Sequence, residues 1–353
     1  MADTVVVVGG ANIDIVAAPY SGFKEHDSNP GRSSISFGGV GRNIAENLAH
    51  LGCNVRFVSV FGDDMFSRML VQDLENKEID ISLSKTVRGE TCSKYVCINS
   101  DKGELVAAIN DMSLYDHMHT AITEEAIRAM NEADMVVLDA NTSEALLENI
   151  TSRCTVPIAF DAVSISKVPR CRNILNRLFI FKPNLYEAEE LCKALESGAD
   201  INATTFPDTK DPTKDHVKGS VKDSANDPEE GPANDLASRA ARYAAILLAN
   251  GVKNVMISLG SDGVYYDNGT ERGIIPSMSS DIVNTSGCGD TFLAGAIKGY
   301  LAGCNVADMV RYGSAAAAVC AASEATVAPE LNLEALRAVL SRSLNSGDQT
   351  AGI

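Results

Sequence analysis

The chain has 353 residues, of which 45% are hydrophobic and 22% are charged, and its formal net charge is −17 at pH 7. This length and composition allow a substantial buried core, although length alone does not separate one domain from two. The acidic charge opposes binding to nucleic acid, because neutralising phosphates takes clustered lysines and arginines. We therefore expect no nucleic-acid partner.

The cysteines and the first residues bear on the compartment. Nine cysteines are scattered without a CxxC pair, and their number is odd. The start MADTVVVVGG lacks the basic and long apolar regions of a signal peptide. No uninterrupted apolar stretch approaches the ~20 residues that span a bilayer. These features predict a cytoplasmic protein without membrane association.

Short β-branched segments alternate with helical patterns along most of the chain. The segments are VVVVGG (5–10), VRFVSVFG (55–62), MVVLDA (135–140), VPIAFDA (156–162), LFIFKPN (178–184) and VMISLG (255–260). Alternation of this kind predicts an α/β fold with a mainly parallel sheet flanked by helices. RNIAENLAHLG (42–52) and LASRAARYAAILLANG (236–251) are expected to be crossover helices that stop at a glycine.

Three stretches depart from this alternation. In 16–37 and 87–109, short strands joined by Gly, Asn and Asp turns follow one another without helices, which we interpret as a small second sheet, a lid over the first. The stretch 197–235 is rich in proline and charge and poor in aliphatic clusters, so we expect a disordered acidic insertion. We expect residues 1–353 to form a single domain around it.

The stretch NTSGCGDTF (284–292) puts small residues and one acid before a predicted helix. Gly287 and Gly289 let the backbone turn tightly and approach a ligand closely. The free N–H groups of residues 287–290 would converge at the positive end of a helix dipole, which suits a phosphate. Asp290 fits either a catalytic role or an ordinary acid at a helix start.

Two further motifs, GGANID (9–14) and SFGGVGRN (36–43), carry glycines and short polar side chains at strand ends. Such side chains suit the vicinal hydroxyls of a sugar, because one carboxylate accepts two O–H hydrogen bonds. Each motif alone is also explained by a turn or a cap. The residues concerned are Asn12, Asp14, Gly38, Gly39 and Asn43.

A fourth motif, KPNLYEAEEL (182–191), ends a strand and opens a helix. Asn184 and Glu187 could hold a hydrated magnesium ion there through water. A helix cap is again the alternative.

Together and in this order, the motifs resemble the ribokinase-like (PfkB) family of carbohydrate and nucleoside kinases. The resemblance also takes in FGDD (61–64) and ISLGSDGVYY (257–266), and it leaves out only the insertion. It implies a ribokinase-like fold with a small β-sheet lid. It further implies a reaction in which a sugar hydroxyl attacks the γ-phosphate of ATP in the presence of Mg²⁺.

The resemblance also implies roles for individual residues. Asp290 matches the family's general base, and the amides of the turn from Gly287 through Cys288 and Gly289 to Asp290 match its anion hole. The implied sugar-binding residues are Asn12, Asp14, Gly38, Gly39 and Asn43. The implied nucleotide-binding residues are Asn184, Ser258, Gly260 and Gly263, with Glu187 reaching magnesium through water.

Two positions depart from the commonest family pattern. Asn284 stands where many members carry an aspartate that helps bind a monovalent cation, so activation by potassium is left open. Cys288 replaces the usual alanine, and because only its N–H is needed, activity is expected to survive.

A narrower similarity within the family is to the pseudouridine kinases. Four segments carry it: NPGRSSISFGGVGRNIAENLAHLG (29–52), AINDM (108–112), FDAVSISK (160–167) and NTSGCGD (284–290). It implies phosphorylation of the 5′-hydroxyl of pseudouridine. Asn110 and Asp111 then either pair with uracil edges or form a hairpin turn, and Lys167 serves either the phosphates or a surface.

Other substrates would keep the same motifs. Ribose, adenosine and fructose are the alternatives for a related kinase, and a non-catalytic metabolite-binding protein is the alternative from a different class. An exposed lid sheet commonly pairs with a copy of itself, so we expect a homodimer formed through the lid.

Overall fold

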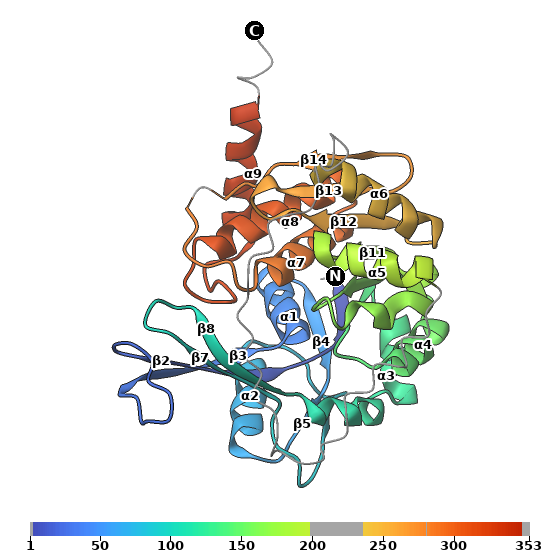
Figure 1. Ribbon diagram of the computed structural model, residues 1–353. Helices are drawn as coiled ribbons and strands as arrows, with labels where there is room; N and C mark the ends of the chain where they lie inside the picture. The colour runs from blue at the N-terminus through green and yellow to red at the C-terminus, as the bar shows by residue number, and fades with distance from the viewer. Residues whose placement is uncertain (1–2, 198–235, 280, 348–353) are drawn as a thin grey trace.

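The computed structural model describes residues 3–197, 236–279 and 281–347. Its central sheet has eight strands in the order β14-β13-β12-β11-β10-β9-β1-β4 (Figure 1). All neighbouring strands from β4 to β12 pair in parallel, and only the pairs that involve β13 are antiparallel. The mainly parallel α/β fold is therefore confirmed. The bounds are β1 (Thr4–Val8), β4 (Asn54–Val58), β9 (Met135–Asp139), β10 (Ile158–Asp161), β11 (Ile180–Lys182), β12 (Asn254–Ser258), β13 (Val264–Asp267) and β14 (Arg272–Ile275).

Helices cover both faces of this sheet. The apolar run of β1 explains why, since Val5 and Val7 pack into one buried cluster while Val6 and Val8 pack into another. Successive side chains of a strand point to opposite faces, so a strand that is apolar throughout needs cover on both. In Figure 1, α1, α7 and α8 lie on one side of the sheet, and α3 to α6 lie on the other.

The bounds of the helices in the described residues follow, with the 3-10 helices last: α1 (Val40–His50), α2 (Met65–Asn76), α3 (Glu124–Asn131), α4 (Glu144–Arg153), α5 (Leu185–Ser197), α6 (Leu236–Ala249), α7 (Cys288–Leu301), α8 (Val306–Ala321), α9 (Leu333–Gly347), η1 (Ser113–Ala121), η2 (Val168–Arg177) and η5 (Gly260–Asp262). The two expected crossover helices are α1 and α6. Each ends just before a glycine in the left-handed region, Gly52 at φ 76° and Gly251 at φ 102°.

A separate sheet of four strands, in the order β3-β2-β7-β8, projects from the large sheet (Figure 1). Its strands are β2 (Asn12–Pro19), β3 (Gly31–Gly38), β7 (Lys94–Asn99) and β8 (Leu105–Asp111). It begins earlier and ends later than the segments 16–37 and 87–109. The reason is that β2 continues straight out of GGANID, where Asn12 pairs with Gly38, and that β8 extends until Asp111 pairs with Lys94. Two short strands, β5 (Val60–Phe61) and β6 (Lys85–Thr86), form a further pair.

The predicted insertion at 197–235 lies outside the described residues from 198 onward. Within the part of the chain that the structure describes, no helix combines the length and the apolar character needed to cross a membrane.

Candidate active site

Three charged side chains close three neighbouring strands of the large sheet. Asp139, Asp161 and Lys182 end β9, β10 and β11, and they face one another as register partners across the sheet. Each is at most 7% exposed. The carboxyl ends of parallel strands are where open α/β sheets bind ligands. Sequence reasoning gave these three residues no role, although each is a charged residue that closes an apolar strand.

Asp290 lies beside this charged row, in the first turn of α7. The helix begins after Gly287, whose φ of 78° is left-handed and whose missing Cβ leaves room for the Thr326 carbonyl. Asp290 is 9% exposed, and its Oδ2 accepts a hydrogen bond of 2.8 Å from Asn43 Nδ2. The first bond of the helix runs from the Thr291 N–H to the Gly287 carbonyl, so the amides of Gly289 and Asp290 precede the helical ladder.

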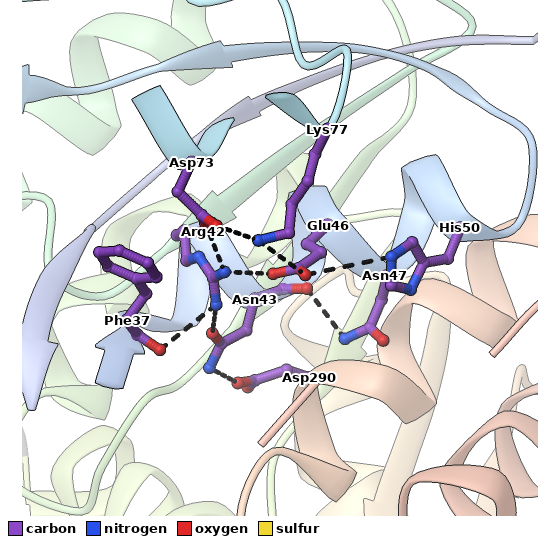
Figure 2. Close-up of polar contacts among 9 residues, drawn as sticks. All are labelled: Phe37, Arg42, Asn43, Glu46, Asn47, His50, Asp73, Lys77 and Asp290. Atoms are coloured by element: carbon purple, nitrogen blue, oxygen red, sulfur yellow. Dashed lines mark hydrogen bonds and ion pairs between the residues drawn. The ribbon is translucent and has the colours of Figure 1, made fainter. Parts of the chain in front are cut away.

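A buried network fixes the amide of Asn43 (Figure 2). Arg42 Nη1 donates to Asn43 Oδ1 at 3.1 Å, so the amide must turn its Nδ2 toward Asp290. Arg42 Nη2 also donates to Asp73 Oδ2 of α2 at 2.9 Å and forms an ion pair with Glu46. The residue that holds Asp290 is therefore itself held by a link between two helices.

Asp139 joins the end of β1 to the start of α1. Its Oδ2 accepts hydrogen bonds from the backbone N–H groups of Gly10, at 2.8 Å, and Gly41, at 2.9 Å. A Cβ on Gly41 would lie 2.7 Å from the Gly9 Cα, so the two segments need glycines to approach this closely. Asp139 thereby sets the position of α1, the helix that carries Asn43.

Burial and charge set the protonation of this cluster. Burial, with the charge of Asp161, raises the pKa of Asp290 to about 8, although the Asn43 hydrogen bond and Lys182 oppose the rise. Burial alone would lower the pKa of Lys182, but Asp161, Asp290 and Glu187 together outweigh it and hold the pKa above its ordinary value. A carboxyl group that titrates near neutral pH beside a permanent ammonium is suited to accept a proton.

The predicted sugar-binding residues of the small sheet come together with one another. Asn12 Nδ2 donates to Asp14 Oδ1 at 2.6 Å. A Cβ on Gly38 would lie 3.0 Å from Asn12 Nδ2 and would collide with the Asp14 carboxylate. Gly39, with φ 101°, then turns the chain into α1 and so toward Asn43. Burial raises the pKa of Asp14, and the Asn12 bond and the Arg42 charge oppose the rise.

The structure separates Asn110 from Asp111. Both lie in β8, not in the hairpin turn considered as the alternative. The register aligns Asp14, Tyr95 and Asn110 in one row across β2, β7 and β8, so their side chains share one face. Asp111 pairs with Lys94 and belongs to the opposite face, where its Oδ1 accepts from Ser113 Oγ at 3.0 Å.

Lys167 lies near the charged row and not on an open surface. Its Nζ donates to Asn141 Oδ1 at 2.7 Å, and Asn141 Nδ2 donates in turn to Asp139 Oδ2 at 3.2 Å. Burial lowers the pKa of Lys167, while the Asp139 charge acts in the opposite direction.

Asn184 and Glu187 cap α5 reciprocally. The Glu187 N–H donates to Asn184 Oδ1 at 2.9 Å, and the Asn184 N–H donates to Glu187 Oε2 at 2.8 Å. The two bonds form a capping box, which uses one carboxylate oxygen of Glu187, Oε2. The described residues contain no group of three or more side chains that could hold a metal ion. One buried carboxylate fits Mg²⁺ only if nucleotide phosphates and water supply the other ligands, which is how this ion is often bound.

The predicted nucleotide residues lie along the end of β12. Ser258 forms a bridge with Asn184, and Gly260 and Gly263 turn the chain into β13 with φ values of 65° and 96°. A Cβ on Gly263 would lie 2.8 Å from the Pro276 backbone.

Pro276 also lines a cavity of about 1130 Å³ between β14, α8 and α9. The apolar side chains that line it include Ile275, Ala318, Val319, Ala335 and Val339.

The side chain of Asn284 forms hydrogen bonds that hold the loop before α7 in place. Its Oδ1 accepts from the Ser286 N–H at 2.9 Å, and its Nδ2 donates to the Glu324 carbonyl at 3.1 Å. The Cys288 thiol lies 3.7 Å from the Asn284 carbonyl, and its backbone N–H makes a long 3.3 Å bond to the Thr285 carbonyl. The side chain of Cys288 thus points away from the amides that precede the helix.

Comparisons with known proteins show what the chain is similar to. Residues 2–209 and 228–332 match the model of a family described as pfkB family carbohydrate kinase. A pseudouridine kinase of Escherichia coli (strain K12) is 30% identical over 337 residues, which cover 94% of this chain and 94% of that protein. A guanosine-inosine kinase of Exiguobacterium acetylicum is 24% identical over 338 residues, or 94% of this chain and 99% of that protein. The solved structure of an Arabidopsis thaliana ribokinase complexed with ribose and ATP has the same fold, with a TM-score of 0.76 at 20% identity over 96% of this chain and 99% of that one.

Proposed function

The chain belongs to the pfkB family of carbohydrate kinases, and from that premise we propose that it transfers the γ-phosphate of ATP to the 5′-hydroxyl of pseudouridine. The products are pseudouridine 5′-monophosphate and ADP. The observation that carries the substrate assignment is the 30% identity to a pseudouridine kinase over 94% of both chains. The register row of the small sheet supports a nucleoside independently.

Asp290 is the general base of the proposed reaction. The acceptor oxygen bonds to the γ-phosphorus, its proton passes to the Asp290 carboxylate, and the bond from the γ-phosphorus to the bridging oxygen breaks toward ADP. Asn43 holds the carboxylate in place through its 2.8 Å bond. The amides of Gly289 and Asp290, at the positive end of α7, face the charge on the phosphoryl oxygens.

Magnesium bound with the nucleotide would neutralise charge on the phosphates. Glu187, 6% exposed and next to Asn184 at the start of α5, would hold this ion through water. Ser258, Gly260 and Gly263 would contact the phosphates. The cavity beyond Pro276, whose lining mixes apolar and polar side chains, has the volume to take the adenine base.

The nucleoside is proposed to lie along the row of Asp14, Tyr95 and Asn110. Asp14, with Asn12, Gly38 and Gly39, binds the ribose hydroxyls. Because neighbouring strands are about 4.8 Å apart, Asn110 stands about 10 Å from Asp14, a span that a nucleoside bridges and a lone pentose does not. Tyr95 lies between them, where its ring can stack on the base. Lys167 and Asn141 are proposed to contact substrate from the side of the charged row.

A second copy of the chain is proposed to cover the other face of the small sheet. There, Ile15, Ile35, Val96 and Ile109 form one register row, and Ile35 and Ile109 are 53% and 70% exposed. When two exposed sheets pair through such rows, both their apolar surface and their unpaired strand edges are covered.

We also assign the enzyme to the cytoplasm, because all nine cysteines are described and none forms a disulfide.

A substrate panel tests the proposal. Purified enzyme would be assayed for ADP release with pseudouridine, uridine, adenosine, inosine, ribose and fructose at equal concentrations. We expect kcat/KM for pseudouridine to exceed that for uridine by at least ~10-fold, because pseudouridine presents an N1–H that uridine lacks. Preference for a purine nucleoside or a free sugar would overturn the assignment of pseudouridine as the substrate and leave the assignment of kinase activity standing. No ATP turnover with any acceptor would favour a metabolite-binding protein.

A further inference from the structure

Lys182 is a buried cation to which the reaction described above gives no role. Its Nζ lies 2.8 Å from Asp161 Oδ2, with both side chains less than a tenth exposed. Burying such a pair removes two charges from water, and apolar side chains of similar size often serve stability as well or better. A stabilising role alone is therefore a weak reason for an ion pair at this point of the sheet.

The ammonium of Lys182 lies against the turn that opens α7. A Cβ on Gly289 would come within 2.9 Å of Lys182 Nζ. Gly289, unlike Gly287, does not adopt the left-handed backbone conformation that favours glycine. A side chain at Gly289 would therefore displace the ammonium from its place beside this turn. The charge of Lys182 and the free amides at the start of α7 thus place positive potential at the same point, beside Gly289.

Asp161 is oriented so that it can hold this ammonium. Its Oδ1 accepts a hydrogen bond of 2.8 Å from the Val163 N–H, which leaves Oδ2 for Lys182. Val163 has a φ of 64°, a conformation that is costly for a β-branched residue. The backbone is therefore held in an unfavourable conformation at the residue whose N–H fixes the carboxylate that contacts the lysine.

We propose that Lys182 is a catalytic residue whose ammonium contacts an oxygen of the transferring γ-phosphoryl group, and that Asp161 is a positioning residue that holds it there. The inference rests on the proposed phosphoryl transfer and not on the identity of the acceptor. The acceptor oxygen gains the bond to phosphorus, its proton goes to Asp290, and ADP leaves with the electron pair of the broken bond. Lys182 neither gives nor takes a proton, and it balances charge on the phosphoryl oxygens during transfer.

The first test is the neutral substitution Lys182→Met. We expect kcat to fall by at least ~10², with KM for ATP and for the acceptor within about threefold of wild type, because the contact strengthens in the transition state. The matched control is Lys298→Met, which removes a lysine in the last turn of α7, far from Asp290, where Nζ pairs with Asp3 Oδ2 at 2.9 Å. This control should keep wild-type kcat. A folded Lys182→Met enzyme with kcat within threefold of wild type would overturn the proposal.

A second readout separates catalysis from support of the fold. Aluminium fluoride with ADP imitates the transferring phosphoryl group, so calorimetry should show that it raises ADP affinity in wild type and not in Lys182→Met. A lysine that only neutralises its neighbours would leave that gain intact. If Lys182→Met does not fold, Asp161→Asn keeps the volume and should lower kcat by about tenfold, with loss of the same gain.

A double substitution tests whether Asp161 acts through Lys182. The kcat of the double variant Lys182→Met with Asp161→Asn should be no lower than that of Lys182→Met alone. Once the ammonium is gone, Asp161 has nothing left to position, so its loss has no further effect on the rate. Multiplied losses would overturn the positioning role of Asp161. All rates are compared on whichever acceptor the wild type uses, so a preferred acceptor other than pseudouridine overturns the substrate assignment and leaves this inference standing.

Discussion

The end of the large sheet and the outer strand of the small sheet are built in opposite ways. Asp139, Asp161 and Lys182 are at most 7% exposed and have fixed partners, whereas all seven residues of β8 are exposed. A buried charge tolerates little change, because removing one partner leaves the other unpaired. Exposed strand positions change at small cost to stability. We infer that, in the proposed reaction, the buried strand ends serve phosphoryl transfer and the small sheet serves the choice of acceptor.

The largest effect should come from the base. Asp290→Asn should reduce kcat by ~10²–10⁴ with little change in ATP affinity, because the amide keeps the hydrogen bond to Asn43 and cannot accept the proton. Steady-state rates and nucleotide titration measure the two quantities. Turnover near the wild-type value would remove Asp290 from the mechanism and would break the division between the two regions.

The pH dependence should follow the same carboxylate. With its pKa raised to about 8, Asp290 is mostly protonated at pH 6, so kcat/KM should rise by about tenfold per pH unit and level off above pH 8.

The same raised pKa affects stability. The folded state binds a proton that the unfolded state releases near pH 4, so this group lowers the free energy of unfolding as pH rises from about 4 to 8. Asp290→Asn should therefore melt higher than wild type at pH 8, by roughly 2 °C or more. A variant that melts lower would contradict the raised pKa.

Asn110 and Asp111 allow the two faces of the small sheet to be compared within one strand, β8. Asn110→Ala should shrink the preference for pseudouridine over uridine by up to ~10-fold, because Asn110 shares the face of Asp14. Asp111→Ala, on the opposite face, should leave the preference unchanged. Asp14→Asn should slow both nucleosides alike, since both share the ribose. Equal effects of the two neighbouring alanine substitutions would show that the face of the strand does not decide substrate choice.

The opposite face of the small sheet should govern assembly. A chain with Ile35→Asp and Ile109→Asp should sediment as a monomer where wild type sediments as a dimer, because the two exposed side chains of that row become charged. Stability of each chain should change little. Arg32→Asp, also in β3 but outside that row, is the matched control and should keep the dimer. A monomeric wild type would contradict the proposed homodimer.

The smallest effect should come from monovalent cations. Asn284 offers no negative charge, and its Nδ2 already donates to the Glu324 carbonyl that a cation could otherwise contact. Replacing potassium by tetramethylammonium at constant ionic strength should change kcat by less than about twofold. Activation of tenfold or more would show that a cation binds in spite of the amide.

The parts of the proposed site that are local can be picked out in the sequence. Asn12, Asp14, Asn43 and Asp290 lie within or directly after short glycine-containing motifs, which can be recognised from the sequence alone. Lys182, Asp161 and Asp139 were missed because strand pairing brings them together, and register between distant strands cannot be counted from one sequence. The same limit explains Asp111: alternation assigns it a different face from Asn110, but which face meets the substrate depends on the neighbours of β8.

The hydrogen bond between Asn43 and Asp290 joins residues 247 positions apart. Strands β9 to β14 extend the large sheet in the order in which a ribosome makes them, while α7, which packs against α1, is made after all of them. At typical rates of synthesis, roughly 10–50 s separate the two partners of that bond. By the end of this interval the nascent chain contains all eight strands of the large sheet but not yet Asp290, and the side of α1 that α7 covers stays exposed until α7 is made.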